Sequence, residues 1–229
     1  MRILVTRPRE DGEQIAAKLA ALGHQALLAP LLEPRFHDGP ELALGDVQAI
    51  LATSANGIRA LIRRTSRRDI PVFAVGPQTT EEARAAGFAD VRNADGDSRA
   101  LAAAVARWTV PEKGALLHVC GEDAPGTLVE SLARQGFATR RQALYAIEAA
   151  TALPPEIREA VERGDVDAVL FFSPVSAKIF LKVCAGISTM EMTAFCISPA
   201  TADVLPPGAF AGVRTAAAPN QAALLALVE

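Results

Sequence analysis

Short apolar runs alternate along this chain with Ala- and Leu-rich stretches whose hydrophobic positions recur at helical spacing. Arg2–Thr6 is typical of a strand, and Asp11–Leu22 predicts a helix that Gly23 ends. The same alternation predicts strands at Gln25–Leu32, Val47–Thr53, Val72–Val75, Ala115–Val119, Thr139–Glu148, 166–172 and 193–197, and helices at Asn56–Thr65, Thr79–Ala86, Leu101–Arg107, Thr127–Gln135, 176–184, 200–205 and 220–228. Pro34–Pro40 is interpreted as a link, and Thr79–Glu82 as a capping box. Strands that are apolar throughout and alternate with helices indicate parallel sheets covered on both faces.

The second half of the chain repeats the first at a distance of about 120 residues, which is too long for a solenoid unit and predicts two similar domains. The matching pairs are Ala49–Asn56 with Ala168–Val175, Val72–Thr79 with Thr193–Thr201, Ala86–Val91 with Gly208–Val213, Leu22–Gly23 with Gln135–Gly136, and Leu31–Leu32 with Leu144–Tyr145. We name the segment with Leu22–Leu32 a and the segment with Ala49–Val91 b; their counterparts a′ and b′ contain Gln135–Tyr145 and Ala168–Val213, so the order along the chain is a, b, a′, b′. The repeat alone leaves open whether the domains are a+b and a′+b′, or a+b′ and b+a′ with 36–150 inserted in the other domain.

Composition narrows the class of protein. The 229 residues are half hydrophobic, enough for a core in each domain, and the net charge of −3 argues against a general nucleic-acid binder. Three scattered cysteines without a CxxC pair favour a reducing cytoplasm over a disulfide framework. We expect neither a signal peptide nor a membrane span, because no apolar run has the required length.

The candidate chemistry lies where the predicted strands end, since ligands of open parallel sheets bind at the carboxyl ends of the strands. These junctions are Thr6–Pro8, Thr53–Asn56, Gly76–Thr79, Cys120–Glu122, Ser173–Ser176 and Ser198–Thr201. Each serine or threonine taken singly fits a simple helix N-cap. As a set, the junctions predict helix N-termini that offer N–H groups to an anion, such as a carboxylate, in a cleft between the two domains.

Other motifs are weaker or missing. Neither nucleotide-binding fingerprint occurs, there is no GxSxG elbow, and the three histidines lack metal-ligand spacing. His118 lies in a predicted strand and is interpreted as a satisfied, half-buried residue. The arginines between Arg59 and Arg68 fit either a solvated face or a rim that captures carboxylates. Tyr145, the only tyrosine, fits a half-buried strand residue or a proton donor that stays protonated at neutral pH.

Seven short segments resemble, in order and over essentially the whole chain, the motifs of uroporphyrinogen-III synthases. They are Val5–Pro8, Thr53–Gly57, Val75–Thr79, Leu144–Tyr145, Phe171–Pro174, Ser198–Ala202 and Ala218–Leu225. The resemblance implies two flavodoxin-like α/β domains, made as a+b′ and b+a′, joined by two linkers around a ligand cleft. One domain is 1–34 plus 151–229, and the other is 35–150. The resemblance also implies a lyase that closes hydroxymethylbilane, with inversion of ring D and loss of water, to give uroporphyrinogen III. The implied reaction needs neither metal nor cofactor.

The resemblance also assigns site residues. Tyr145 matches the tyrosine suggested to assist departure of the hydroxyl group. The substrate carries eight carboxylates, and the residues implied to bind it are Arg7, Thr53, Ser54, Asn56, Gly76, Gln78, Thr79, Gly121, Ser173, Ser176, Ser198 and Thr201. One turn departs from the family, which commonly has Gly-Pro-Thr-Thr where this chain has Ser198–Thr201. Ser198 lacks the backbone freedom of glycine, Ala200 lacks a hydroxyl, and Asp203–Pro207 predicts a shortened helix.

Hydroxymethylbilane, handed over by hydroxymethylbilane synthase, is the expected partner of a cytoplasmic monomer that binds neither nucleic acid nor membrane. Two other functions fit a two-lobed α/β chain. The first is a non-catalytic module that binds a small ligand. The second is a transferase that uses an activated sugar, although the basic nucleotide-phosphate site expected late in such a chain is not visible.

Overall fold

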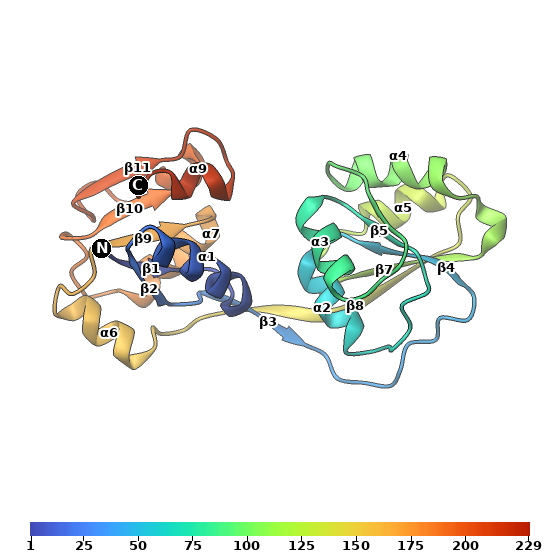
Figure 1. The fold of residues 1–229 in the computed structure, drawn as a ribbon, viewed down its shortest axis with the longest axis horizontal. Helices are drawn as coiled ribbons and strands as arrows, with labels where there is room; N and C mark the ends of the chain where they lie inside the picture. Colours follow the sequence, from blue (N-terminus) through green and yellow to red (C-terminus); the bar gives the residue numbers. More distant parts are fainter. The chain divides into compact units, whose positions relative to one another are not determined.

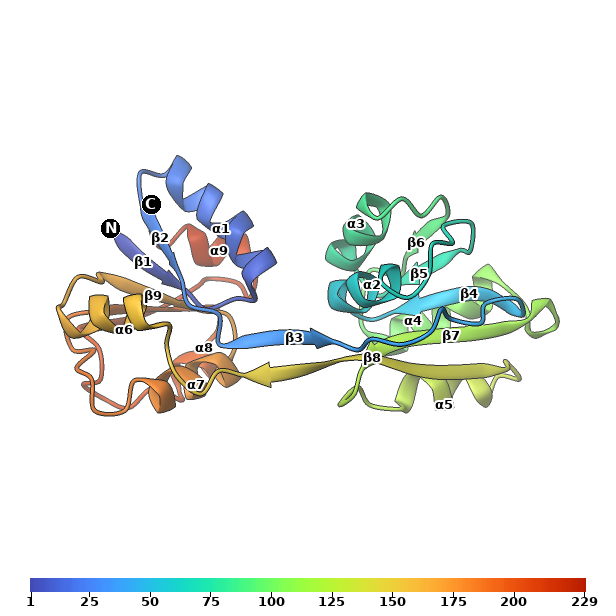
Figure 2. The same ribbon diagram turned by 90° about the horizontal axis from the view of Figure 1, so that it is seen from below.

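The computed structural model describes residues 1–229 and divides into two compact units. Unit 1 consists of Met1–Glu33 and Glu148–Glu229, and unit 2 of Pro34–Ile147. The chain passes between the units twice, on β3 (Leu32–Phe36) and on β8 (Thr139–Ala149), as Figure 1 shows. These two strands pair with each other and run in opposite directions (Figure 2).

Unit 1 contains a five-stranded sheet in the order β11-β10-β9-β1-β2, and all its strand pairs are parallel. The strands are β1 (Arg2–Val5), β2 (Gln25–Leu28), β9 (Ala168–Phe171), β10 (Thr193–Cys196) and β11 (Gly212–Thr215). Counted within the unit, the order is 2-1-3-4-5, which is the flavodoxin-like topology. Unit 1 therefore combines the first two strands of the chain with its last three.

Helices cover both faces of this sheet because every central strand is apolar on both sides. One apolar cluster joins Leu4 and Phe171 to α6 (Pro155–Glu162) and α7 (Pro174–Val183). The other joins Ile3 to α1 (Arg9–Ala21) and α9 (Gln221–Leu225). The remaining helix, α8, is a single turn at Pro199–Ala202.

Unit 2 has a six-stranded sheet in the order β3-β8-β7-β4-β5-β6. Besides β3 and β8, its strands are β4 (Val47–Ala52), β5 (Val72–Ala74), β6 (Val91–Asn93) and β7 (Ala115–Gly121). If β7 and β8 are counted as strands 1 and 2, and β4, β5 and β6 as strands 3, 4 and 5, the parallel strands again have the order 2-1-3-4-5. The antiparallel strand β3 is added at the edge beside β8. The two sheets share one topology, and unit 2 combines segment b with segment a′.

The helices of unit 2 also lie on two faces. Apolar residues of α2 (Ala55–Ile62) and α3 (Pro77–Ala85) pack in one cluster, and those of α4 (Ser98–Trp108) and α5 (Thr127–Ala133) in another. A 3-10 turn at Pro111–Lys113 precedes β7. No helix in either unit combines the length and the apolar character that a membrane crossing requires.

Several predicted elements differ from those observed. The strand predicted at Gln25–Leu32 ends at Leu28, because the pairing with β1 loses its register just beyond it. The Ala29 N–H still donates to the Val5 carbonyl, but the Leu31 N–H donates to the Thr6 carbonyl, where regular pairing would reach Arg7. The chain then forms β3, which occupies part of the segment interpreted as a link. The short strands β6 and β11 and the helix α6 were not predicted from the hydrophobic pattern. In α6, Pro155 occupies the first turn, where a missing N–H costs nothing.

The predicted capping box at Thr79–Glu82 is wrong, because α3 begins two residues earlier. Its N-cap is Gly76, Pro77 occupies the first turn, and the Thr80 hydroxyl donates to the Gly76 carbonyl at 2.9 Å. Thr79 consequently lies inside the first turn, where it is buried.

Candidate functional site

The predicted site residues form two groups, one in each unit, at or beside the carboxyl ends of parallel strands. Unit 2 holds Thr53, Ser54, Asn56, Gly76, Gln78, Thr79, Gly121 and Tyr145, and unit 1 holds Arg7, Ser173, Ser176, Ser198 and Thr201. In unit 2, the strand order reverses between β7 and β4. Such a reversal opens a crevice at the carboxyl edge of a sheet, and ligands of this topology bind there.

Ser54 lies in the turn at this switch point and makes two side-chain contacts. Its hydroxyl oxygen accepts from the Gly57 N–H at 3.0 Å, which caps α2, and lies 2.9 Å from the Tyr145 hydroxyl oxygen. The helix approaches β7 closely, since a Cβ on Gly57 would lie 3.0 Å from the Val119 carbonyl oxygen. Gly57 therefore supports the turn, a role that the sequence interpretation did not assign to it.

Tyr145 lies over the backbone of Gly121 at the end of β7. A Cβ on Gly121 would lie 3.0 Å from the ring, so glycine is what lets the phenol occupy this place. Only 8% of Tyr145 is exposed, and Phe36 packs edge-on against it. Burial raises the pKa of the phenol, and the hydrogen bond with Ser54 opposes that rise. The net upward direction keeps Tyr145 protonated at neutral pH, so it is able to donate a proton.

Thr53 contacts a histidine that the sequence interpretation set aside. Its hydroxyl oxygen lies 3.2 Å from Nε2 of His118, and Nδ1 of the same ring is buried without a hydrogen-bond partner. His118 is 2% exposed, so the interpretation of a half-buried residue is wrong, and the ring is satisfied at Nε2 but not at Nδ1. Burial, together with the Arg141 cation, lowers the pKa of His118 to about 4. The alternation of hydrophobic and polar residues could not show which face of β7 His118 lies on, because β7 is buried on both faces.

Asn56 is held by a buried ion pair between α2 and α3. Nη1 of Arg59 donates to Oδ1 of Asn56 at 3.0 Å, and Nη2 donates to Glu82 at 2.9 Å. Arg59 is 7% exposed. The guanidinium fixes the orientation of the Asn56 amide, because only the oxygen of that amide accepts a hydrogen bond.

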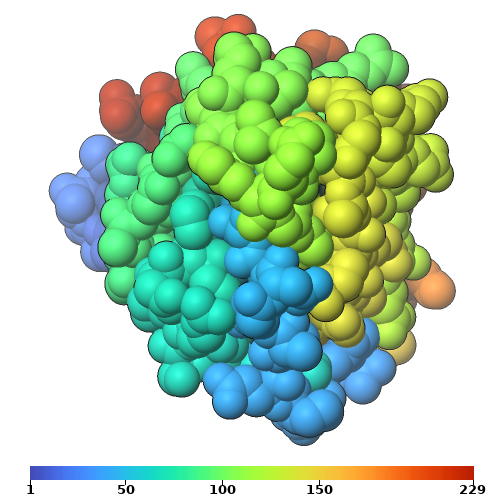
Figure 3. Space-filling model, turned by 90° about the vertical axis from the view of Figure 1, so that its right-hand side faces the viewer, coloured from blue at the N-terminus to red at the C-terminus, as the bar shows by residue number.

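The other arginines of this region are in part solvated, because Arg63 and Arg67 are exposed, but they also make contacts within unit 2. Arg64, Arg67 and Arg68 donate to backbone carbonyls, and the Arg63 guanidinium lies 4.4 Å from the centroid of the Phe36 ring. Two of the acceptors belong to the segment between β3 and β4, which runs over the surface of unit 2 in blue in Figure 3. Arg64 and Arg67 therefore anchor this long connection.

The turn between β5 and α3 presents backbone rather than side chains. Gly76 has an extended backbone, and a Cβ added there would meet no atom within 4 Å. Gln78 is exposed on the first turn of α3. The free space beside Gly76 allows a ligand to approach the backbone closely.

In unit 1, Arg7 follows β1 and is half-buried. It pairs with Asp11, and its guanidinium lies 5.5 Å from the centroid of the Phe172 ring. Its Nε is buried without a partner, so one N–H of the guanidinium group makes no hydrogen bond. The preceding Thr6 is not available to a ligand, because its hydroxyl donates to the Leu170 carbonyl at 2.7 Å.

The serine turns after β9 and β10 differ from each other. Ser173 caps α7 by accepting from the Ser176 N–H at 3.1 Å. Ser198 makes no cap, and its hydroxyl instead lies 3.0 Å from that of fully buried Thr201. The turn that departs from the family motifs thus has its two hydroxyls bonded to each other. The predicted shortening of the following helix agrees with the single turn of α8.

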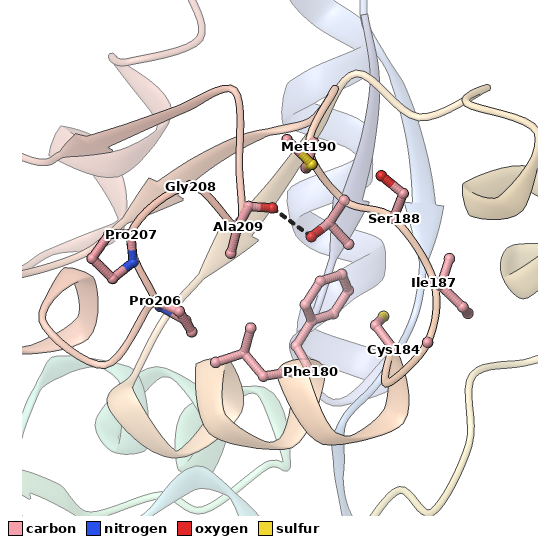
Figure 4. Close-up of a pocket in the computed structure, with 12 residues that line it drawn as sticks. Phe180, Cys184, Ile187, Ser188, Met190, Pro206, Pro207, Gly208 and Ala209 are labelled. Carbon is pink, nitrogen blue, oxygen red and sulfur yellow. Dashed lines mark hydrogen bonds between the residues drawn. The ribbon is translucent and has the colours of Figure 1, made fainter.

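A pocket of about 550 Å³ lies elsewhere in unit 1, beside the C-terminal end of α7 (Figure 4). Phe180, Ile187 and Met190 line it, and the Thr189 hydroxyl donates to the Ala209 carbonyl across its wall. The loops that form it precede β10 and β11, so it lies at the amino edge of the sheet. Its apolar lining does not suit a carboxylate-rich ligand.

Two open sheets whose parallel strands have the flavodoxin-like order, each with polar groups at its carboxyl edge, define a two-domain α/β protein. A family model for uroporphyrinogen-III synthase HemD matches residues 13–226. The chain belongs to the uroporphyrinogen-III synthase family, whose members are lyases of tetrapyrrole biosynthesis.

Solved structures agree with the fold. Uroporphyrinogen-III synthetase from Helicobacter pylori is similar with a TM-score of 0.63 at 18% identity, covering 100% of this chain and 98% of the other. A mutant uroporphyrinogen III synthase from the extremely thermophilic bacterium Thermus thermophilus gives 0.50 at 19% identity, covering 100% and 97%. No curated protein sequence matches.

Proposed function

We propose that this chain catalyses the reaction of its family at the carboxyl edges of its two sheets. Hydroxymethylbilane loses its hydroxyl group as water, and ring D is inverted as the macrocycle closes to uroporphyrinogen III. The match to the family model over residues 13–226 carries this proposal. The test is an assay that separates the isomer I and isomer III porphyrins formed in the presence of the protein.

The donors at the two edges suit a substrate rich in carboxylates. Thr53 and Asn56 are partly exposed, and the first turns of α2 and α7 supply backbone N–H groups. Many such contacts would hold a flexible chain so that the substituted carbon of ring D attacks before the unsubstituted one. Positioning of this kind is worth several kcal/mol of the barrier.

Tyr145 is the proposed assistant for departure of the hydroxyl group. Its proton would pass to the oxygen as the C–O bond breaks, so that water leaves. Tyr145→Phe should lower kcat about 10-fold with little change in KM, because a hydrogen bond to a charge that develops only in the transition state is worth ~1.5 kcal/mol. Thr139→Val, at the other end of β8, removes a hydroxyl away from the edge and should leave kcat unchanged. A folded Tyr145→Phe protein with wild-type kcat/KM would exclude this role.

Gly76→Ala tests whether substrate approaches the turn after β5. The extended backbone accepts alanine, and the added methyl meets no protein atom, so the free energy of unfolding should change by less than ~0.5 kcal/mol. KM should nevertheless rise about 5-fold, because the methyl would clash with a ligand lying on the backbone. Gly212→Ala is the matched control, since its Cβ also meets open space but lies at the amino end of β11. Equal KM values for the two variants would contradict contact at Gly76.

We further propose that the chain acts as a cytoplasmic monomer and receives hydroxymethylbilane from hydroxymethylbilane synthase. Three buried, unpaired cysteines fit a reducing compartment. Light scattering should give the mass of one chain, 24.0 kDa. A dimer at assay concentrations would contradict this part of the proposal.

A further inference from the structure

The tautomer of His118 is determined by the hydrogen-bond partners of its two ring nitrogens. A neutral imidazole has one N–H donor and one acceptor nitrogen. If the proton were on Nδ1, a buried N–H would have no acceptor, which native structures avoid more strictly than an unpaired acceptor. The favoured tautomer therefore carries its proton on Nε2 and donates to the Thr53 hydroxyl oxygen.

This tautomer determines what Thr53 offers to a ligand. Its oxygen already accepts from His118, and that is the one hydrogen bond of its side chain. The hydroxyl hydrogen has no acceptor in the protein, and Thr53 is only half-buried. Thr53 is thus left as a hydrogen-bond donor toward the crevice at the end of β4.

Asn56, on the first turn of the following helix, is arranged in the same way. Arg59 donates to its amide oxygen, so the two N–H groups of the amide remain unused. Arg59 is in turn held by Glu82. The half-buried side chains of Thr53 and Asn56 thus each accept a hydrogen bond from a buried donor within unit 2, which leaves their own N–H and O–H groups unused.

We propose that His118 and Arg59 are positioning residues that turn the hydrogen-bond donors of Thr53 and Asn56, at the turn after β4, toward the substrate, so that these two side chains bind its carboxylates. The inference rests on the proposed function and adds two residues that do not touch the substrate. A turn of this kind binds carboxylates, which only accept, and disfavours ligand groups that only donate.

The tautomer can be measured without substrate. In long-range ¹H–¹⁵N spectra of the wild-type protein, His118 should show a protonated, pyrrole-type Nε2 and an unprotonated, pyridine-type Nδ1. The pattern should persist from pH 8 to pH 5.5, because burial and the Arg141 cation hold the pKa of His118 at about 4. A proton on Nδ1 would overturn the proposal.

Steady-state kinetics test the consequence for the substrate. His118→Leu removes the donor, which frees Thr53 to adopt other orientations, and should raise KM about 5-fold with kcat within 2-fold of wild type. His118→Gln carries an amide N–H near the position of Nε2 and should restore most of the loss. Thr53→Val should match His118→Leu, and the double variant should be no worse than either, because both remove one interaction.

The outcomes distinguish the two proposals. Wild-type protein that makes no uroporphyrinogen III overturns the proposed function and this inference together. Wild-type protein that makes it, with His118→Leu at wild-type KM or with multiplicative effects in the double variant, overturns this inference alone. If His118→Leu does not fold, the tautomer measurement and the comparison of His118→Gln with Thr53→Val decide.

Discussion

Replacing Asn56 with aspartate should raise the KM for hydroxymethylbilane about 100-fold while the protein stays folded. The carboxylate keeps an acceptor for Arg59, so the contact at 3.0 Å is retained. The two outward N–H groups are lost, and a negative charge takes their place. Loss of a hydrogen bond to a charged group costs ~1.5–3 kcal/mol, and repulsion between carboxylates adds to it.

KM, kcat and thermal unfolding of the Asn56→Asp protein decide this prediction. Gln135→Glu makes the same amide-to-carboxylate change at an exposed position after α5, and should keep KM within 2-fold of wild type. Part of the Asn56→Asp defect should diminish as salt is added, because ions screen the repulsion. A folded variant with wild-type KM would show that Asn56 does not meet the substrate.

Acid should destabilise the protein through His118, by about 3 kcal/mol between pH 6.5 and pH 4. Burial is the main cause of the low pKa, which is about 4 in the folded chain against 6.5 for a free histidine. Within this window the unfolded chain binds a proton that the folded chain does not. The free energy of unfolding therefore rises with pH from 4 to 6.5, and the contribution is complete above 6.5.

Urea denaturation of His118→Gln and wild type across this window measures the contribution. The difference between the two curves should change by ~3 kcal/mol from pH 6.5 to pH 4. Thr53→Val is the control, because it removes the partner of the imidazole but keeps the buried ring, and so it should retain most of the acid dependence. Parallel curves for wild type and His118→Gln would contradict a buried, neutral His118.

The pattern of the sequence predicted the class of fold because both sheets rest on central strands that are apolar throughout, such as Ala168–Phe171. It failed where that signal is weak. Val91–Asn93 and Gly212–Thr215 are short and partly exposed, so they carry no continuous apolar run. The repeat also left the pairing of its halves open, because two similar sheets have similar strands whichever halves they share.

The candidate site was predictable in position but not in detail. Strand ends converge on one edge of a parallel sheet, so Thr53, Ser54 and Gly121 could be grouped from their places alone. The residues that orient Thr53 and Asn56 could not be predicted from the sequence. His118 lies inside a strand and Arg59 inside a helix, and only the packed structure shows their contacts with Thr53 and Asn56.

The most direct test of the account is the isomer composition of the product. Hydroxymethylbilane would be generated by its synthase with and without this protein, and the oxidised porphyrins would be separated. The account predicts that adding the protein changes the product from isomer I to isomer III. Isomer I alone, from protein shown to be folded, would contradict it.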